Sequence, residues 1–123
     1  MKKIIFLLAV VVAIALGVSS CTYYENPVTI PAVPDSVSFK ANVLPIFDAR
    51  CDNTGCHTTG GIKPNLSAAT AYNDLITYGL VDTDVPDQSV IYVKVHTGSM
   101  AKFAAPGDAD IILKWIQQGA QDN

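Results

Sequence analysis

Two cysteines and a histidine lie within seven residues of this chain, in Cys51-Asp52-Asn53-Thr54-Gly55-Cys56-His57. They belong to the stretch 38–119, about 82 residues long, whose apolar patterning is that of a folded domain. A domain of this size is marginally stable on its hydrophobic core alone and is usually reinforced by a disulfide, a metal or a bound group. The cysteine pair is therefore where we expect that reinforcement.

The spacer between the cysteines favours a tight turn, because Asn53 or Gly55 can adopt a positive φ. A tight turn brings the two sulfurs close together. A Cys51–Cys56 disulfide is compatible with the short spacing and with an exported chain. A zinc site is less favoured, because it needs a fourth ligand from His96 or a carboxylate, and because the adjacent side chains of Cys56 and His57 diverge.

Residues 1–20 have the pattern of a secretory signal: two lysines, an unbroken apolar run over residues 4–18 and a small-residue end. The signal ends in Val18-Ser19-Ser20-Cys21, which resembles the lipobox of bacterial lipoproteins. The resemblance implies that Cys21 is lipidated and becomes the first mature residue. We therefore expect a lipid anchor in a bacterial membrane, the outer membrane being favoured, with the folded domain facing the periplasm.

Residues 21–37 contain three prolines and no helical or strand periodicity, which predicts an extended tether before a folded domain at 38–123. Cleavage before Cys21 removes two lysines and leaves six basic residues against eleven acidic ones, a net charge of −5. This acidic balance, without a cluster of lysine or arginine, argues against nucleic acid as a partner. It favours protein partners with a basic docking surface.

Helical periodicity and capping residues predict an all-α domain of four short helices. The first helix has Ser38 or Ser36 as its N-cap, and Pro45 inside it predicts a kink or a late start. Ser67 and Asp87 are the expected N-caps of the second and third helices. The predicted helices are Phe39–Arg50, Ser67–Tyr78, Asp87–Val95 and Asp108–Gln118.

Apolar stripes on these helices predict the core. Trp115 lies on the apolar stripe of the last predicted helix, and its main expected role is packing in the core. Side chains expected to pack in the core or to form pocket walls are Ala71, Tyr72, Leu75, Ile76, Tyr78, Tyr92, Ile111, Ile112 and Ile116.

The motif C-x4-C-H resembles the haem-attachment motif of class I c-type cytochromes, in which C-x2-C-H is the commoner form. Three further features follow in the order typical of that family: Pro64-Asn65-Leu66, a methionine in a late loop at Met100, and a final segment Trp115-Ile116-Gln117-Gln118-Gly119-Ala120. This sequence departs from the family in its longer spacer and in having Ala101 after Met100, where proline is frequent. The resemblance covers about 38–120 and implies a cytochrome c-like fold, with the helices arranged around one covalently bound haem.

Carried over by position, the resemblance implies a site of five residues. Cys51 and Cys56 are the thioether residues, and His57 is the proximal iron ligand. Met100 is the distal ligand, and the carbonyl of Pro64 orients the histidine ring. In the late loop, His96 is the alternative sixth ligand.

The function that this resemblance implies is that of a membrane-tethered monohaem cytochrome, which carries single electrons between redox partners in the cell envelope. We expect a carrier and not an enzyme, because the chain has no nucleophile motif, no recognisable carboxylate pair and only two histidines. The alternative is a haem-free lipoprotein interaction module closed by a Cys51–Cys56 disulfide. That alternative requires neither His57 nor Met100.

Overall fold

The structure is a computed structural model that describes residues 29–123. The predicted signal sequence, Cys21 and the first part of the predicted tether lie outside the described residues. Within 29–123, no helix is long and apolar enough to cross a membrane.

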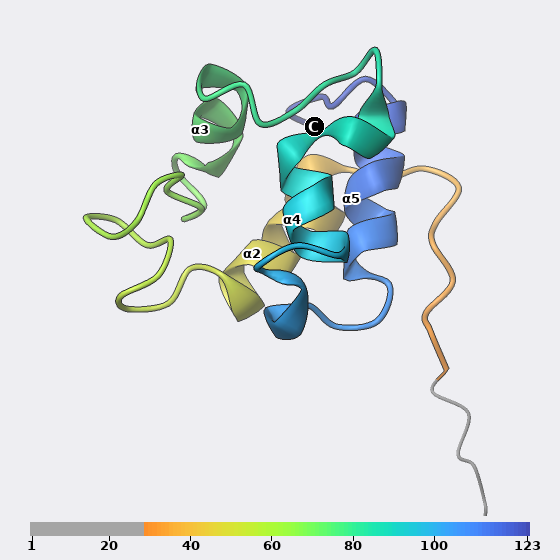
Figure 1. The fold of residues 1–123 in the computed structure, drawn as a ribbon. Helices are drawn as coiled ribbons and strands as arrows, with labels where there is room; N and C mark the ends of the chain where they lie inside the picture. Colours follow the sequence, from red (N-terminus) through yellow and green to blue (C-terminus); the bar gives the residue numbers. More distant parts are fainter. Residues whose placement is uncertain (1–28) are drawn as a thin grey trace, which may run out of the picture.

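The described residues form helices and no strands, which confirms the predicted all-α class and the four short α-helices. Figure 1 shows α4 and α5 side by side, with α3 set apart from them at the end of a long loop that follows α2. In chain order the segments are the π-helix η1 (Phe39–Val43), α2 (Leu44–Arg50), α3 (Ala71–Thr77), the 3-10 helix η2 (Pro86–Gln88), α4 (Val90–His96), the 3-10 helix η3 (Ala101–Phe103) and α5 (Asp108–Gln117).

The first helical region begins where the sequence predicts and changes geometry at its proline. The Ser38 hydroxyl accepts a hydrogen bond from the Ala41 amide, which confirms Ser38 as the N-cap. Regular α-helix starts only at Leu44, with Pro45 in its first turn, where a missing amide proton costs least. The preceding π-turn, closed by the Leu44 amide on the Phe39 carbonyl, is the late start that Pro45 predicts.

The helix α3 is shorter than predicted, because its expected N-cap is used elsewhere. The Asn65 side chain accepts a hydrogen bond from the Ser67 amide, and the Ser67 hydroxyl also contacts that side chain. Ser67 therefore belongs to a side-chain-closed turn, and regular helix begins at Ala71. The predicted burial of Ile76 and Tyr78 is wrong, since 46% and 51% of these residues is exposed.

The segment α4 is a helix, as predicted, although its several valine and isoleucine residues are also common in strands. The expected N-cap Asp87 is wrong, since it lies inside η2, and Ser89 occupies the N-cap position. The buried Ser89 hydroxyl accepts from the Asp82 amide at 2.9 Å and donates to the Asp82 carbonyl at 3.1 Å. This pair of bonds attaches the acidic loop to the start of α4.

The core is centred on aromatic rings from three different segments. Phe39 packs against Trp115 with ring centroids 5.1 Å apart and against Tyr72 at 5.4 Å. Trp115 is 1% exposed, and its indole nitrogen donates to the Gln121 carbonyl, which confirms it as a core residue. The buried apolar residues are Val37, Phe39, Val43, Phe47, Leu66, Ala71, Leu75, Ile91, Val95, Ala109, Ile112, Trp115, Ile116 and Ala120.

The start of the helical region and the C-terminal residues are joined at this core. Val37, the last residue of the predicted tether, is buried and donates its amide to the Gln118 side chain. The Lys40 amide donates to the Asn123 carbonyl at 2.9 Å. These bonds hold η1 against the C-terminal residues that follow α5.

Candidate functional site

A cleft lies between the loop that follows α2 and the segment that runs from α4 into η3. It consists of two adjoining cavities of about 230 and 320 Å³. Both cavities are lined by Cys51, His57, Ile62 and Met100. The first of them is also lined by Cys56, and the second by Pro64. The structure therefore brings together at one cleft all five residues that the resemblance places at the haem.

The loop from Cys51 to His57 is closed by its own backbone. The Cys51 amide donates to the Phe47 carbonyl at the end of α2, and the His57 amide donates back to the Cys51 carbonyl at 3.1 Å. Gly55 has a φ of 82°, so it takes the positive φ expected of this spacer. The longer spacer thus folds back on itself and places Cys51 and His57 close together.

The loop backbone makes a second close contact after His57, between Ile62 and Cys56. The Ile62 amide donates to the Cys56 carbonyl at 2.7 Å. A Cβ atom at Gly61 would overlap that same carbonyl oxygen. Only glycine therefore fits at position 61, where the two parts of the loop backbone come close together. This approach brings Ile62 to the mouth of the cleft.

The ring of His57 is oriented by two backbone carbonyls. Its Nδ1 lies 2.9 Å from the Pro64 oxygen and 3.2 Å from the Ile62 oxygen. Because carbonyls only accept hydrogen bonds, Nδ1 carries the proton, and Nε2 of the neutral ring keeps its lone pair. The hydrogen bond expected between Pro64 and His57 is present, and it leaves Nε2 as the atom available to a metal.

The segment that supplies these carbonyls is anchored from α3. The Asp74 carboxylate accepts from the Asn65 amide at 2.6 Å and from the Lys63 ammonium at 3.1 Å. The amide hydrogen bond of Asn65, followed by the interaction with Lys63, holds the pKa of Asp74 below its ordinary value of 3.8. Asp74 therefore holds the backbone after Pro64, through the Asn65 amide, and the side chain of the residue before it, Lys63.

The two cysteines are free thiols in different environments. Cys51 is half-buried, whereas Cys56 is exposed. Burial, together with the nearby charges of Asp108 and Cys56, raises the pKa of Cys51 to about 11, against a smaller lowering effect of Arg50. A thiol with so high a pKa is a poor nucleophile at neutral pH, which does not favour a catalytic cysteine.

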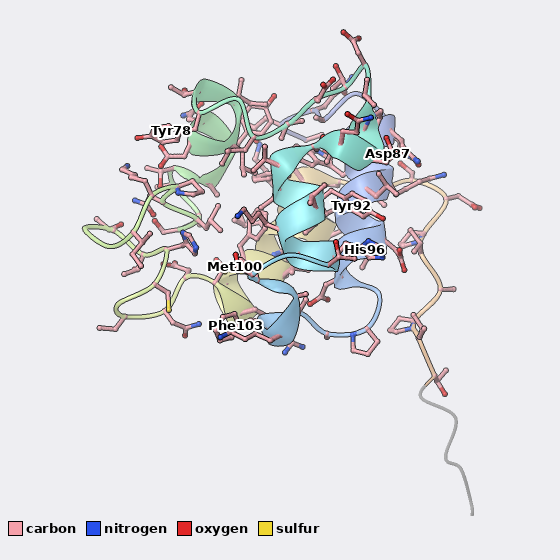
Figure 2. All side chains as sticks on the ribbon, in the orientation of Figure 1. Tyr78, Asp87, Tyr92, His96, Met100 and Phe103 are labelled. Atoms are coloured by element: carbon pink, nitrogen blue, oxygen red, sulfur yellow. The ribbon has the colours of Figure 1, made fainter. Side chains whose placement is uncertain are left out.

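The structure separates the two candidates for the sixth ligand. Met100 is half-buried and lines both cavities. His96 is exposed, stacks on Tyr92 with ring centroids 5.0 Å apart and lines neither cavity. In Figure 2, Met100 and Phe103 lie on the side of the molecule that carries the cysteine loop, whereas His96 and Tyr92 lie toward α5.

The walls of the cleft include residues that the sequence did not single out. Ile62, Phe103 and Val90 line it although they are 60%, 51% and 44% exposed. Arg50, Lys63 and Lys94 also line it. No periodic pattern marks either residue, since Ile62 lies in an irregular loop and Phe103 at the end of the three-residue η3. Only the folded chain brings them to the cleft.

These residues fit a covalently held haem. Two free thiols, one imidazole nitrogen and one thioether face a cleft whose remaining walls are largely apolar, and such walls suit a flat hydrophobic ring. Within 29–123, no group of three or more His, Cys, Asp or Glu side chains is arranged to hold a metal ion alone. A zinc site at Cys51, Cys56 and His57 therefore gains no support from this geometry.

Comparison of the chain with protein-family profiles, with curated proteins and with solved structures gave no significant match.

Proposed function

We propose that this chain is a monohaem c-type cytochrome, a single-electron carrier of the cell envelope tethered to a membrane through Cys21. The observation that carries the proposal is the convergence of Cys51, Cys56, His57 and Met100 on one apolar cleft. These residues come from two segments more than 40 positions apart in sequence. When bound, the haem supplies one-electron transfer, and the protein sets its potential through ligands, burial and charge.

Each residue has a defined task in this proposal. Cys51 and Cys56 hold the group covalently, and their loop is preset by the backbone bond from His57 to Cys51. His57 binds iron through Nε2, because Nδ1 donates to the Pro64 carbonyl. Met100 supplies a thioether, a ligand that favours the reduced iron and raises the potential relative to a second imidazole.

A carrier fits this site better than an enzyme does. If His57 and Met100 both bind iron, no coordination position is left for a substrate. The cleft also holds no activated nucleophile, since burial keeps the Cys51 thiol protonated at neutral pH. The proposed work is exchange of single electrons with redox proteins of the envelope, in short-lived encounters.

The first test is the visible spectrum of the mature protein produced in a host with haem-attachment machinery. We expect a sharp band in the reduced state that survives denaturation and is lost in Cys51→Ala/Cys56→Ala, because thioether bonds do not depend on folding. Thr54→Ala, in the same loop, is the matched control and should keep the band. A colourless wild-type protein with a Cys51–Cys56 disulfide would refute the proposal and favour a haem-free interaction module.

The second test concerns the sixth ligand. Met100→Ala should shift the reduction potential to a more negative value and change the spectrum, because a thioether favours the reduced iron. His96→Ala should leave both unchanged, since His96 lines neither cavity. The opposite pattern would assign the sixth position to His96.

A further inference from the structure

One carboxylate connects the end of α2 to the segment that follows η3. Asp108, the first residue of α5, accepts a hydrogen bond from the Ala105 amide at 2.7 Å and forms an ion pair with Arg50 Nε at 3.2 Å. Both contacts use the same oxygen, Oδ2. Only 13% of the Asp108 side chain is exposed, so water screens these contacts less than it would on an open surface.

The two partners of Asp108 belong to different segments, and of the two only Arg50 lines the cleft. Arg50 is the last residue of α2 and directly precedes Cys51. Ala105 lies two residues beyond η3, the turn that begins after Met100. Without Asp108, no other hydrogen bond or ion pair in the described part of the chain joins Arg50 to the segment 104–108.

The charge of Asp108 lies beside the cysteine loop. Asp108 is ion-paired with Arg50, the residue that directly precedes Cys51. Arg50 is bound to Asp108, so the two opposite charges are held as a pair beside the cleft. Asp108 thus contributes both a geometric link and a local negative potential.

We propose that Asp108 is a positioning residue, which closes the Met100 segment onto the end of α2 and sets the electrostatic potential at the Cys51 side of the cleft. The expected effect of Asp108 on a bound haem rests on the proposed function. The connection that Asp108 makes between α2 and the Met100 segment does not depend on that proposal, and it can be measured whether or not the protein carries a haem.

The geometric part is tested by amide hydrogen exchange in the mature protein as purified. In Asp108→Ala, exchange at Ala105 should be about tenfold faster or more, because a bond to a charged acceptor is lost. Asp108→Asn should retain most of the protection, since its amide oxygen still accepts from Ala105. Equal protection in wild type and Asp108→Ala would overturn the link.

The electrostatic part needs Asp108→Asn, which removes the charge and keeps the acceptor. In haem-loaded protein, the reduction potential should become more positive, because less negative charge then stabilises the oxidised state. The matched control is Asp110→Asn, an exposed carboxylate of the same helical turn with the same charge change.

The two proposals fail in distinguishable ways. If no haem attaches but Ala105 exchange responds as expected, the proposed function is wrong and the role of Asp108 as a link stands. If a haem is attached and Asp108→Asn moves the reduction potential no more than Asp110→Asn does, the electrostatic role is wrong.

Discussion

At the scale of single residues, two backbone oxygens fix the tautomer and the orientation of the His57 ring. Its Nδ1 faces the oxygens of Pro64 and Ile62, so the ring cannot rotate without losing both contacts. Those oxygens lie in an irregular segment with no helix of its own to stiffen it. Its stiffness comes from Asp74, which binds the Asn65 amide and the Lys63 ammonium from α3.

We predict that Asp74→Asn lowers the thermal stability of the protein at neutral pH. The folded-state pKa of Asp74 is depressed below 3.8, so its contribution is present above pH 3.8 and is lost as the pH falls through the folded-state value. The difference in unfolding temperature between wild type and Asp74→Asn should therefore shrink when the pH is lowered from 7 to about 2.

Asp48→Asn is the control for this prediction, because Asp48 is exposed on α2. It should change stability little at any pH in that range. A difference between wild type and Asp74→Asn that stays constant from pH 7 to pH 2 would contradict the assignment of the effect to the ionised carboxylate.

At the scale of elements, the end of α4 determines which side chain enters the cleft. The Gly98 amide donates to the Val93 carbonyl at 2.8 Å, and the Met100 amide donates to the Lys94 carbonyl at 3.0 Å. The chain thus folds back over the last turn of α4 and carries Met100 to the cleft. His96 remains on the helix, stacked on Tyr92.

This reversal predicts that position 98 requires glycine. A Cβ at Gly98 would lie 2.8 Å from the Lys94 Cα and 2.9 Å from the Val93 oxygen, both backbone atoms with little freedom to move. We expect Gly98→Ala to lower the free energy of unfolding by about 1–3 kcal/mol, measured by chemical denaturation. Ser99→Ala, one residue on and exposed, is the control. Equal stability of Gly98→Ala and wild type would show that the turn relaxes freely.

At the scale of the whole molecule, the net charge and the charge at the cleft have opposite signs. After the predicted cleavage the chain would carry −5, yet the charged side chains that line the two cavities are all basic: Arg50, Lys63 and Lys94. Arg50 is paired with Asp108 and Lys63 with Asp74, so Lys94 is the one of the three with no ion-pair partner among the described residues. Lys102 lies nearby, over the ring of Phe103 at 4.9 Å. The net charge predicts a basic partner surface, whereas the cleft predicts an acidic one.

The sign of the salt dependence separates these two predictions. In the haem-loaded protein, oxidation by the anion hexacyanoferrate(III) should slow as salt is added, because charges within about 10 Å of the cleft dominate at 0.1 M ionic strength. Lys94→Gln/Lys102→Gln should weaken this dependence more than Lys40→Gln/Lys114→Gln, which changes the net charge equally. A rate that rises with added salt would show that the net charge of the protein, and not the charge near the cleft, governs its encounter with the anion.

The sequence by itself determined what depends on near neighbours along the chain. The stripe of Ile112, Trp115 and Ile116 specifies a helix, because residues three and four apart share one helical face. The turn at Gly55 and the late start at Pro45 follow from the allowed φ of single residues. These features, and the grouping of Cys51 with His57, were therefore predictable.

Only the tertiary structure decided which distant residues meet at the cleft. Met100 and His96 lie only four positions apart in sequence, and the backbone reversal at Gly98 separates them. Asp108 pairs with Arg50, which lies far from it along the chain, and this pairing depends on how α5 packs. Asp74 reaches back from α3 to the loop at Lys63 and Asn65. No local pattern encodes these pairings, because a long-range contact forms only after the whole core has brought both partners into reach.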